Sequence, residues 1–337
     1  MKKRILYIGN ALSRRGSTIT SIEHFGGLLR KEGYTVHITS TKKNKVIRML
    51  DMMWATCTLS KKVDIVLIDT YSTTNFWYAI IVGRLCEFFR RPYIPILHGG
   101  NLPTRVMRNP KISKRLFKTA KVNIAPSYYL FNALENEEVL NLECIPNSIS
   151  LENYNYKKRI SLLPKLLWVR SFASIYNPMM ALRVLEELLK EYPEASLTMV
   201  GPAKDGVYEK CFAFAKAQNL KVNFTGLLSK KEWIELAASH DIFISTTNFD
   251  NTPVSVIEAM ALGLPVVSTN VGGMPFLINQ GIDGLLCPPK KIQPFVASIK
   301  DLLSQPELAN SLAENARKKA ESFDWSVVKK RWEEVLS

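Results

Sequence analysis

Two carboxylates stand eight positions apart, Asp250 and Glu258, in the stretch FDNTPVSVIEAMALGLPVVSTNVGG (249–273). Asp250 lies in an expected loop and Glu258 in the helix that follows, so both can reach one site from different backbone elements. Thr252 is the expected N-cap and Pro253 the first helical residue, because a proline lacks the N–H that is unpaired there. Free N–H groups and the helix dipole attract an anion at such a start. The stretch therefore predicts a site for a phosphorylated small molecule.

Two series of alternating strands and helices would position these residues. The strands expected in the first half are 4–8, 35–40, 65–68, 93–97 and 122–125. In the second half they are 166–169, 196–200, 222–224, 242–245 and 266–269, with helices near 178–191, 206–218, 230–239, 254–262, 292–303 and 307–321. Alternating order implies parallel sheets covered on both faces. The predicted domains are 1–150 and 151–322, joined by a polar linker near 146–164, with a helix at 323–337 that packs back on the first. A ligand is expected between them.

Three further residues are candidates because of their place at the carboxyl ends of strands, where doubly wound folds bind ligands. Arg170 ends the first strand of the second half, and its planar fork of donors suits a diphosphate. His98 ends the fourth strand, before two glycines. Gly16 closes the basic loop GNALSRRG after the first strand, although Gly9 and Gly16 do not form a GxGxxG. Taken singly, a surface arginine, a structural histidine and an ordinary loop are equally good interpretations.

Length and composition restrict the class of protein. The 337 residues are 47% hydrophobic, which suits two ordinary globular domains. The start MKKRILYIGN has only a strand's length of apolar residues, so no signal peptide is expected. The most apolar run, 76–89, is shorter than the ~20 residues that span a bilayer. Five cysteines without CxxC spacing indicate reduced thiols and, with the missing signal peptide, a cytoplasmic protein.

The positive charge is concentrated in the first half. Residues 1–150 hold 23 Lys and Arg against 10 Asp and Glu, while residues 151–337 hold 22 against 20. The stretch 104–122 has seven basic residues and no acidic one. A helix beginning near Pro110 would put Lys111, Lys114, Arg115, Lys118 and Lys121 on one face. Such a face is either simply solvated or docks on anionic lipid, to which Arg105 and Arg108 would add. Base-stacking aromatic residues are scarce there, which disfavours nucleic acid.

The order of motifs resembles glycosyltransferase family 4, a family of retaining enzymes with the GT-B fold. The resemblance covers nearly the whole chain. Its most specific part is the carboxylate, seven residues, Glu pattern with EAMALGLPVVSTNVGG; VRSF, IPNSI, GLLSKKE and HGG support it. It implies a hexosyltransferase with two Rossmann-like domains that face each other across a cleft. The second binds most of a nucleotide sugar and the first presents the acceptor.

The resemblance also implies roles for individual residues. Glu258 would bind the ribose hydroxyls of the donor, Asp250 the hydroxyls of the transferred sugar and Arg170 the diphosphate. His98 would approach the donor sugar, and Gly16 would let the first-domain loop come close to the phosphates. The remaining donor contacts would come from Asn251, Thr252, Pro253, Val254 and Ser255.

Two positions depart from the family pattern. Asp250 stands where the family usually has Glu, so the sugar contact is shifted by one methylene. The family commonly has a Lys a few residues after the arginine, whereas this chain has SIYNP with Asn177 nearest. A second cation for the diphosphate would then come from elsewhere, with Arg14 or Arg15 as candidates.

The expected reaction is a front-face substitution without a metal ion, because the pattern holds neither a DxD-like motif nor a carboxylate placed like a glycosidase nucleophile. The acceptor expected from the basic first half is a lipid-linked saccharide at the inner membrane surface. A UDP-sugar is favoured as donor by family frequency alone. The alternatives are another GT-B enzyme, such as a sugar-nucleotide epimerase or a phosphorylase, and a noncatalytic peripheral membrane protein. A dinucleotide oxidoreductase is disfavoured, since neither half has the glycine fingerprint.

Overall fold

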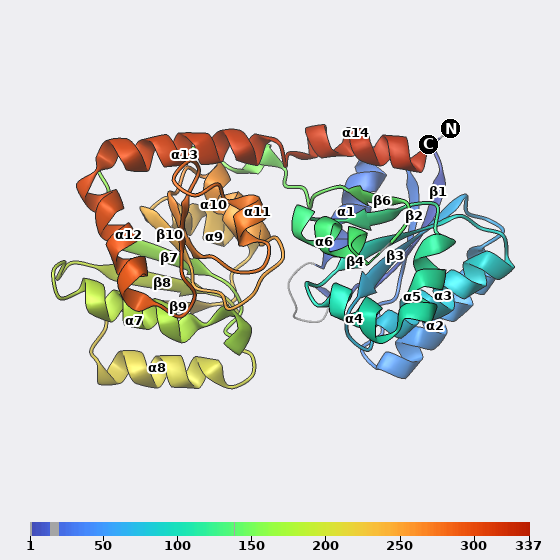
Figure 1. Cartoon of the computed structure of the whole chain (residues 1–337), viewed down its shortest axis with the longest axis horizontal. Coiled ribbons are helices and arrows are strands. Elements are labelled where there is room, and N and C mark those ends of the chain that lie inside the picture. Colours follow the sequence, from blue (N-terminus) through green and yellow to red (C-terminus); the bar gives the residue numbers. More distant parts are fainter. Residues whose placement is uncertain (1, 14–19, 138) are drawn as a thin grey trace. The chain divides into compact units, whose positions relative to one another are not determined.

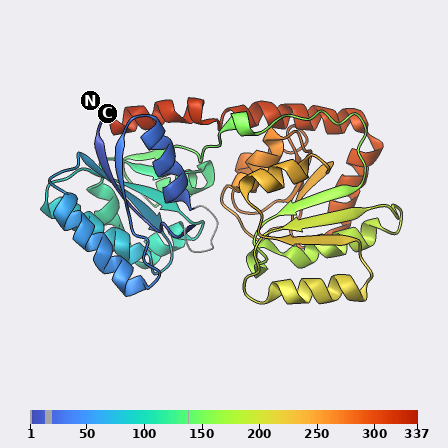
Figure 2. The same ribbon diagram turned by 180° about the vertical axis from the view of Figure 1, so that it is seen from behind.

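The chain forms two compact units, each with its own parallel sheet and core (Figure 1; Figure 2 shows the reverse view). The computed structural model describes residues 2–13, 20–137 and 139–337. The first unit is Met1–Pro146 with Lys330–Ser337, and the second is Asn147–Lys329. Three predicted residues, Arg14, Arg15 and Gly16, lie outside the described residues.

The first unit is built on six parallel strands in the order β2-β1-β3-β4-β5-β6. Its central strands are continuous apolar runs because helices cover both faces, and β3 has six buried residues among its seven. The direction of strand addition reverses between β1 and β3, which is the switch point where such sheets bind ligands. The elements are β1 (Arg4–Ile8), α1 (Ser21–Lys31), β2 (Thr35–Thr39), α2 (Lys45–Leu59), β3 (Ile65–Tyr71), α3 (Phe76–Phe88), β4 (Tyr93–His98), α4 (Leu102–Arg108), α5 (Pro110–Lys118), β5 (Asn123–Ala125), α6 (Tyr128–Glu135) and β6 (Leu142–Cys144).

The second unit repeats this plan with the order β12-β11-β10-β7-β8-β9. Strands β7, β10 and β11 lie at its centre, and their carboxyl ends meet at one edge. The elements are η2 (Leu151–Asn153), β7 (Lys165–Val169), η3 (Ser174–Tyr176), α7 (Pro178–Leu188), β8 (Ser196–Val200), α8 (Val207–Ala217), β9 (Val222–Gly226), α9 (Lys230–Ala237), β10 (Ile242–Ser245), α10 (Val254–Ala261), β11 (Val266–Thr269), α11 (Met274–Leu277), β12 (Leu285–Cys287), α12 (Ile292–Ser304) and α13 (Pro306–Glu321).

The last helix, α14 (Trp325–Leu336), begins in the second unit and ends in the first. Its start is tied to the second unit, where the Trp325 N–H donates to Ile149 O at 2.8 Å. Its end is buried in the first unit, where the Trp332 ring packs on Phe25 with centroids 4.4 Å apart. Lys121 Nζ also donates to Val335 O at 2.9 Å there. The first unit is therefore completed by a segment that follows the whole second unit in the chain.

Candidate functional site

Helix α10 begins at Val254, the start of the predicted range 254–262 and one residue after the predicted first helical residue Pro253. Pro253 is its N-cap, with φ −70° and ψ 115°, so the assignment of Thr252 as N-cap and Pro253 as first helical residue is wrong. The extended ψ puts Pro253 outside the helix while its carbonyl accepts from the Val256 N–H at 3.1 Å. Among the described residues, nothing accepts a hydrogen bond from the N–H groups of Val254 and Ser255. These two donors are available to an anion.

The loop before α10 is fixed by the glycines that follow β11. The Gly273 N–H donates to Asp250 O at 2.9 Å. A Cβ on Gly273 would collide with Asn251 O, and one on Gly272 with Asp250 O. Both glycines are needed for this close approach of two backbones. The predicted candidates Asp250 and Asn251 therefore lie against the glycine loop Gly272–Gly273.

Glu258 is a buried carboxylate with two partners on one oxygen. Its Oε1 accepts from Tyr154 OH at 2.7 Å and lies 2.6 Å from Lys230 Nζ. Burial, followed by the nearby Glu258 charge, raises the pKa of Tyr154 well above its usual value, so its hydroxyl keeps its proton and donates. No described residue donates to Oε2. Glu258 is thus held in place through one oxygen and leaves the two lone pairs of the other for ligand hydroxyls.

Arg170 and Asp250 form an ion pair, Nη2 with Oδ2. The guanidinium carbon of Arg170 also lies 4.9 Å from the ring centroid of Tyr176, a cation–π contact. The other oxygen of Asp250 accepts from the Asn251 N–H at 2.9 Å. Gly201 lies against the backbone of Arg170, where a Cβ would collide with the Arg170 carbonyl. The predicted diphosphate ligand and the predicted sugar ligand therefore hold each other in place before any donor binds.

Asn177 has a backbone role. It adopts the left-handed conformation, φ 47° and ψ 54°, directly before Pro178 begins α7. Asparagine tolerates this conformation better than lysine. Its side-chain amide donates to Asn248 Oδ1 at 3.4 Å. The left-handed turn explains why an asparagine occupies this position. Because asparagine is neutral, Asn177 supplies no second cation for a diphosphate.

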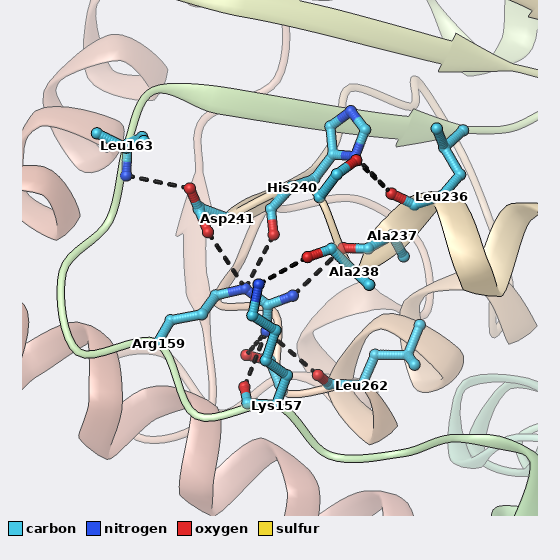
Figure 3. A network of polar contacts seen from close by, with 11 residues as sticks. Lys157, Arg159, Leu163, Leu236, Ala237, Ala238, His240, Asp241 and Leu262 are labelled. Carbon is cyan, nitrogen blue, oxygen red and sulfur yellow. Dashed lines mark hydrogen bonds and ion pairs between the residues drawn. The ribbon is translucent and has the colours of Figure 1, made fainter.

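The predicted interdomain linker is bound to the second unit by Arg159 (Figure 3). The guanidinium is buried, and Nε lies 3.5 Å from the carboxylate of Asp241. It donates to five backbone carbonyls, at 2.8 to 3.3 Å, those of Lys157, Ala237, His240, Leu262 and Gly263.

These carbonyls include the ends of two helices. Ala237 ends α9, and Leu262 is the C-cap of α10. A cation at two helix C-termini is favoured by both dipoles and occupies carbonyls that have no partner within their helices. Arg317 adds to this fixation by donating from Nη1 to Ala261 O at 2.6 Å and to Tyr154 O at 2.8 Å. The segment that carries Tyr154 is thereby held against the helix that carries Glu258.

His240 beside this network is buried and neutral. Its Nδ1 donates to Leu236 O at 2.9 Å and its Nε2 accepts from Thr198 Oγ1 at 2.8 Å. Burial lowers the pKa of His240, against the opposing effects of the Leu236 carbonyl and Asp241. The folded ring takes up a proton at lower pH than the ordinary ~6.5 of the unfolded chain.

We expect this difference to make unfolding pH-dependent. Below about pH 6.5 the unfolded chain binds more protons at His240 than the folded chain, so the free energy of unfolding falls as pH falls toward the folded pKa. Urea unfolding at pH 7.5 and pH 5.5 measures the loss. His240→Gln should flatten this pH dependence, whereas an equal loss in the variant would assign it to other groups.

In the first unit, His98 lies in a polar cluster at the carboxyl edge of the sheet. Its Nε2 is 3.0 Å from Asp69 Oδ1, and its ring stacks on Tyr71 with centroids 5.1 Å apart. Tyr7 OH donates to the same Asp69 oxygen at 2.9 Å, and Gly9 leaves room for this carboxylate. Sequence reasoning missed Asp69, although a carboxylate inside the apolar run IVLIDT is a visible signal.

The basic stretch of the first unit is partly neutralised within the fold. Lys121 lies beyond the end of α5, so the prediction that it shares the helical face is wrong. Arg115 pairs with Glu87 at 2.8 Å, and Arg105 Nε donates to Ser72 O at 3.0 Å. The predicted cations that are exposed and have no partner among the described residues are Arg108, Lys111 and Lys118.

Comparison with known proteins identifies the second unit's relatives. Residues 157–319 match the family Glycosyl transferases group 1. The group 1 stretch contains Arg159, Arg170, Asp250 and Glu258, and ends before α14. A curated relative, the sulfoquinovosyl transferase SQD2 of Arabidopsis thaliana, is 31% identical over 152 residues, which are 43% of this chain and 28% of that protein. The matching stretches cover less than half the length of three curated relatives.

Solved structures match the whole chain. HepE of Anabaena, solved with UDP, superposes with a TM-score of 0.79 at 17% identity over 99% of both chains. The same protein with UDP-glucose gives 0.78 at 16% over the same shares. Sucrose-phosphate synthase of Thermosynechococcus elongatus gives 0.81 at 15%, over 99% of this chain and 98% of that one. The predicted fold class, two Rossmann-like α/β domains as in GT-B enzymes, is confirmed.

Two kinds of feature are absent from residues 2–13, 20–137 and 139–337. No helix among them is both long and apolar enough to cross a membrane. In the same residues, no three His, Cys, Asp or Glu side chains are grouped so that they could hold a metal ion.

Proposed function

We propose that this chain is a retaining glycosyltransferase of family 4. It would move a sugar from a UDP-sugar to a hydroxyl of a lipid-linked saccharide, in the synthesis of a surface polysaccharide or glycolipid. The transfer reaction would take place in the cytoplasm, at the inner face of the cell membrane. The observation that carries the proposal is the group of donor-binding features in the second unit.

These features match the parts of a nucleotide sugar. The free N–H groups of Val254 and Ser255 and the guanidinium of Arg170 suit the diphosphate. The unoccupied oxygen of Glu258 suits the ribose hydroxyls. Asp250, paired with Arg170, would accept from hydroxyls of the sugar. Relatives support the choice of donor, since HepE has been solved with UDP-glucose.

The proposed chemical step uses these residues. The bond between the anomeric carbon and the diphosphate oxygen breaks, and its electron pair stays on the diphosphate. Arg170 and the α10 N-terminus stabilise the charge that develops there. The acceptor oxygen forms its bond on the same face, and its proton passes to the departing phosphate oxygen. His98, together with Asp69, would approach the donor sugar from the first unit.

The proposed lipid-linked acceptor is inferred from the positive charge of the first half of the chain. The first half of the chain carries most of the basic surplus, and Arg108, Lys111 and Lys118 are exposed without partners among the described residues. Each cation near an anionic lipid surface contributes about 1 kcal/mol. Such a surface would bring the protein to a lipid-linked acceptor.

Thermal unfolding in the presence of candidate donors tests the proposal. A ligand that binds only the folded chain raises the melting temperature. We expect UDP and one UDP-sugar to raise it and NAD to leave it unchanged. Release of UDP with the sugar appearing on an acceptor, also with chelator present, would separate transfer from epimerase, phosphorylase and purely binding functions. A chain that no nucleotide sugar stabilises would refute the proposal.

Replacing Arg170 tests the diphosphate contact. Arg170→Lys keeps the charge but loses the planar fork and the contact with Tyr176. We expect kcat to fall by about 10²-fold, the effect of one lost donor to a developing oxyanion. The matched control is Arg183→Lys on the exposed side of α7, which should keep full activity. Equal activities of the two variants would show that Arg170 does not take part in the reaction.

A further inference from the structure

Helix α2 exposes an apolar face. Val46, Ile47, Leu50 and Trp54 are exposed by 61%, 52%, 55% and 72%. Their spacing places them on one side of the helix, and the exposed Cys57 extends it. A helix on the surface of a globular unit normally turns polar residues outward. A contiguous exposed apolar face of this kind marks an interaction surface.

The charged residues within α2 do not interrupt this face. Arg48 is buried, and its guanidinium carbon lies 5.8 Å from the ring centroid of Tyr78. Asp51 accepts from Ser40 Oγ at 2.5 Å. The opposite side of the helix, with Met52, belongs to the core of the first unit. Both long sides of α2 are therefore apolar, and the described residues cover only one of them.

Lysines flank the exposed face at both ends. Lys42, Lys43 and Lys45 precede or begin the helix, and Lys61 and Lys62 follow it. All are exposed, and none pairs with a carboxylate of the described residues. Residues 41–120 hold fifteen Lys and Arg and four Asp and Glu. Each of these acids has a partner: Asp51 with Ser40, Asp64 with Arg4, Asp69 with His98 and Glu87 with Arg115.

We propose that α2 docks on a bilayer of anionic phospholipid. The helix would lie along the surface over its length of about 22 Å, with its apolar face among the upper acyl chains. The flanking lysines would contact headgroup phosphates, and Trp54 would sit at the interface that tryptophan prefers. The inference rests on the membrane contact in the proposed function and adds an apolar element to it. It is independent of the donor site.

A second copy of the chain fits this face less well. Four side chains on one helix offer far less than the ~800 Å² per partner of a stable interface. Two-fold pairing along α2 would also bring the five lysines of one copy near those of the other. Anionic lipid instead complements both the apolar face and the charge around it.

Sedimentation with vesicles tests the proposal. Vesicles of phosphatidylglycerol and phosphatidylcholine in equal parts are compared with vesicles of phosphatidylcholine alone. Each is tested at a salt concentration of about 0.1 M, where charges interact over about 10 Å, and of about 1 M, where they interact over about 3 Å. We expect the protein to bind the anionic vesicles and to keep part of this binding in high salt. Leu50→Ser with Trp54→Ser should weaken binding at least tenfold and abolish the high-salt part.

Two controls make the result specific. Ile160→Ser with Ile282→Ser changes two apolar residues of the second unit that are 80% and 55% exposed, and this variant should bind like the wild type. Lys111→Gln with Lys118→Gln should weaken only the low-salt binding. Unchanged stabilisation by UDP shows that the α2 variant is folded and its donor site intact.

Two outcomes would overturn the inference. One is an α2 variant that sediments with anionic vesicles as the wild type does. The other is a dimer, found by light scattering, that the same variant abolishes, since the face would then bind a second copy. Loss of nucleotide binding in the wild type would refute the proposed function and leave the vesicle result intact.

Discussion

Glu258→Gln should bind the nucleotide-sugar donor more than 100-fold more weakly than the wild type. The amide keeps the shape of the side chain but loses the negatively charged oxygen that would accept hydrogen bonds from two ribose hydroxyls. Hydrogen bonds to a charged group contribute about 1.5–3 kcal/mol each, and about 3 kcal/mol in total corresponds to more than 100-fold in affinity. Isothermal titration with UDP measures the change.

The fold should survive this substitution. Lys230 is half-exposed and can return to water, and Tyr154 OH can donate to the amide oxygen. Glu235→Gln, on the exposed side of α9, is the matched control and should bind UDP normally. Tyr154→Phe should weaken binding only several-fold, because it removes a group that orients Glu258. An affinity for UDP that Glu258→Gln leaves unchanged would contradict the whole donor site.

Arg159→Met should destabilise the protein by about 3–5 kcal/mol, the range for breaking a buried ion pair by removing one partner. The methionine fills the space of the side-chain stem but removes five hydrogen bonds to carbonyls and the ion-pair partner of Asp241. Ala237 O, Leu262 O and Asp241 Oδ2 each keep one backbone N–H donor. Two of those carbonyls lie at the ends of the helices α9 and α10. The substitution therefore weakens the contacts that hold α10, the helix that carries Glu258. Urea unfolding followed by circular dichroism measures it.

The neighbouring residue provides the control. Lys158 forms an exposed ion pair with Glu314 at 3.0 Å, and such pairs contribute about 0–1 kcal/mol. Lys158→Met should therefore unfold almost like the wild type. If the two variants lose equal stability, the buried network does not hold the segment as described.

The sheets were largely predictable because their central strands are buried on both faces. Apart from Ser245 and Ser268, the runs Ile242–Ser245 and Val266–Thr269 are apolar or β-branched. They are bounded by polar residues or proline, and β10 and β11 have these bounds. The edge strands β6 and β12 were missed. Each has three residues and pairs with one neighbour, so neither length nor periodicity distinguishes it from a loop.

The candidate site was predictable where a residue begins or ends an element. Arg170 follows β7, and Asp250 and Glu258 flank the start of α10. Pro253 was predicted as the first helical residue and is the N-cap. A proline suits both positions, and only its ψ angle, which the sequence does not show, distinguishes them. Tyr154 was missed, since its partner Glu258 is 104 positions away and no local pattern announces such a pairing.

Helix α14 imposes an order on the synthesis of this protein. Residues 330–337 complete the first unit, yet the ribosome makes them only after every residue of the second. Until then the surface that Trp332 covers around Phe25 stays open to chaperones and proteases. The amino-terminal domain of this chain is thus the first to begin folding and cannot be the first to finish.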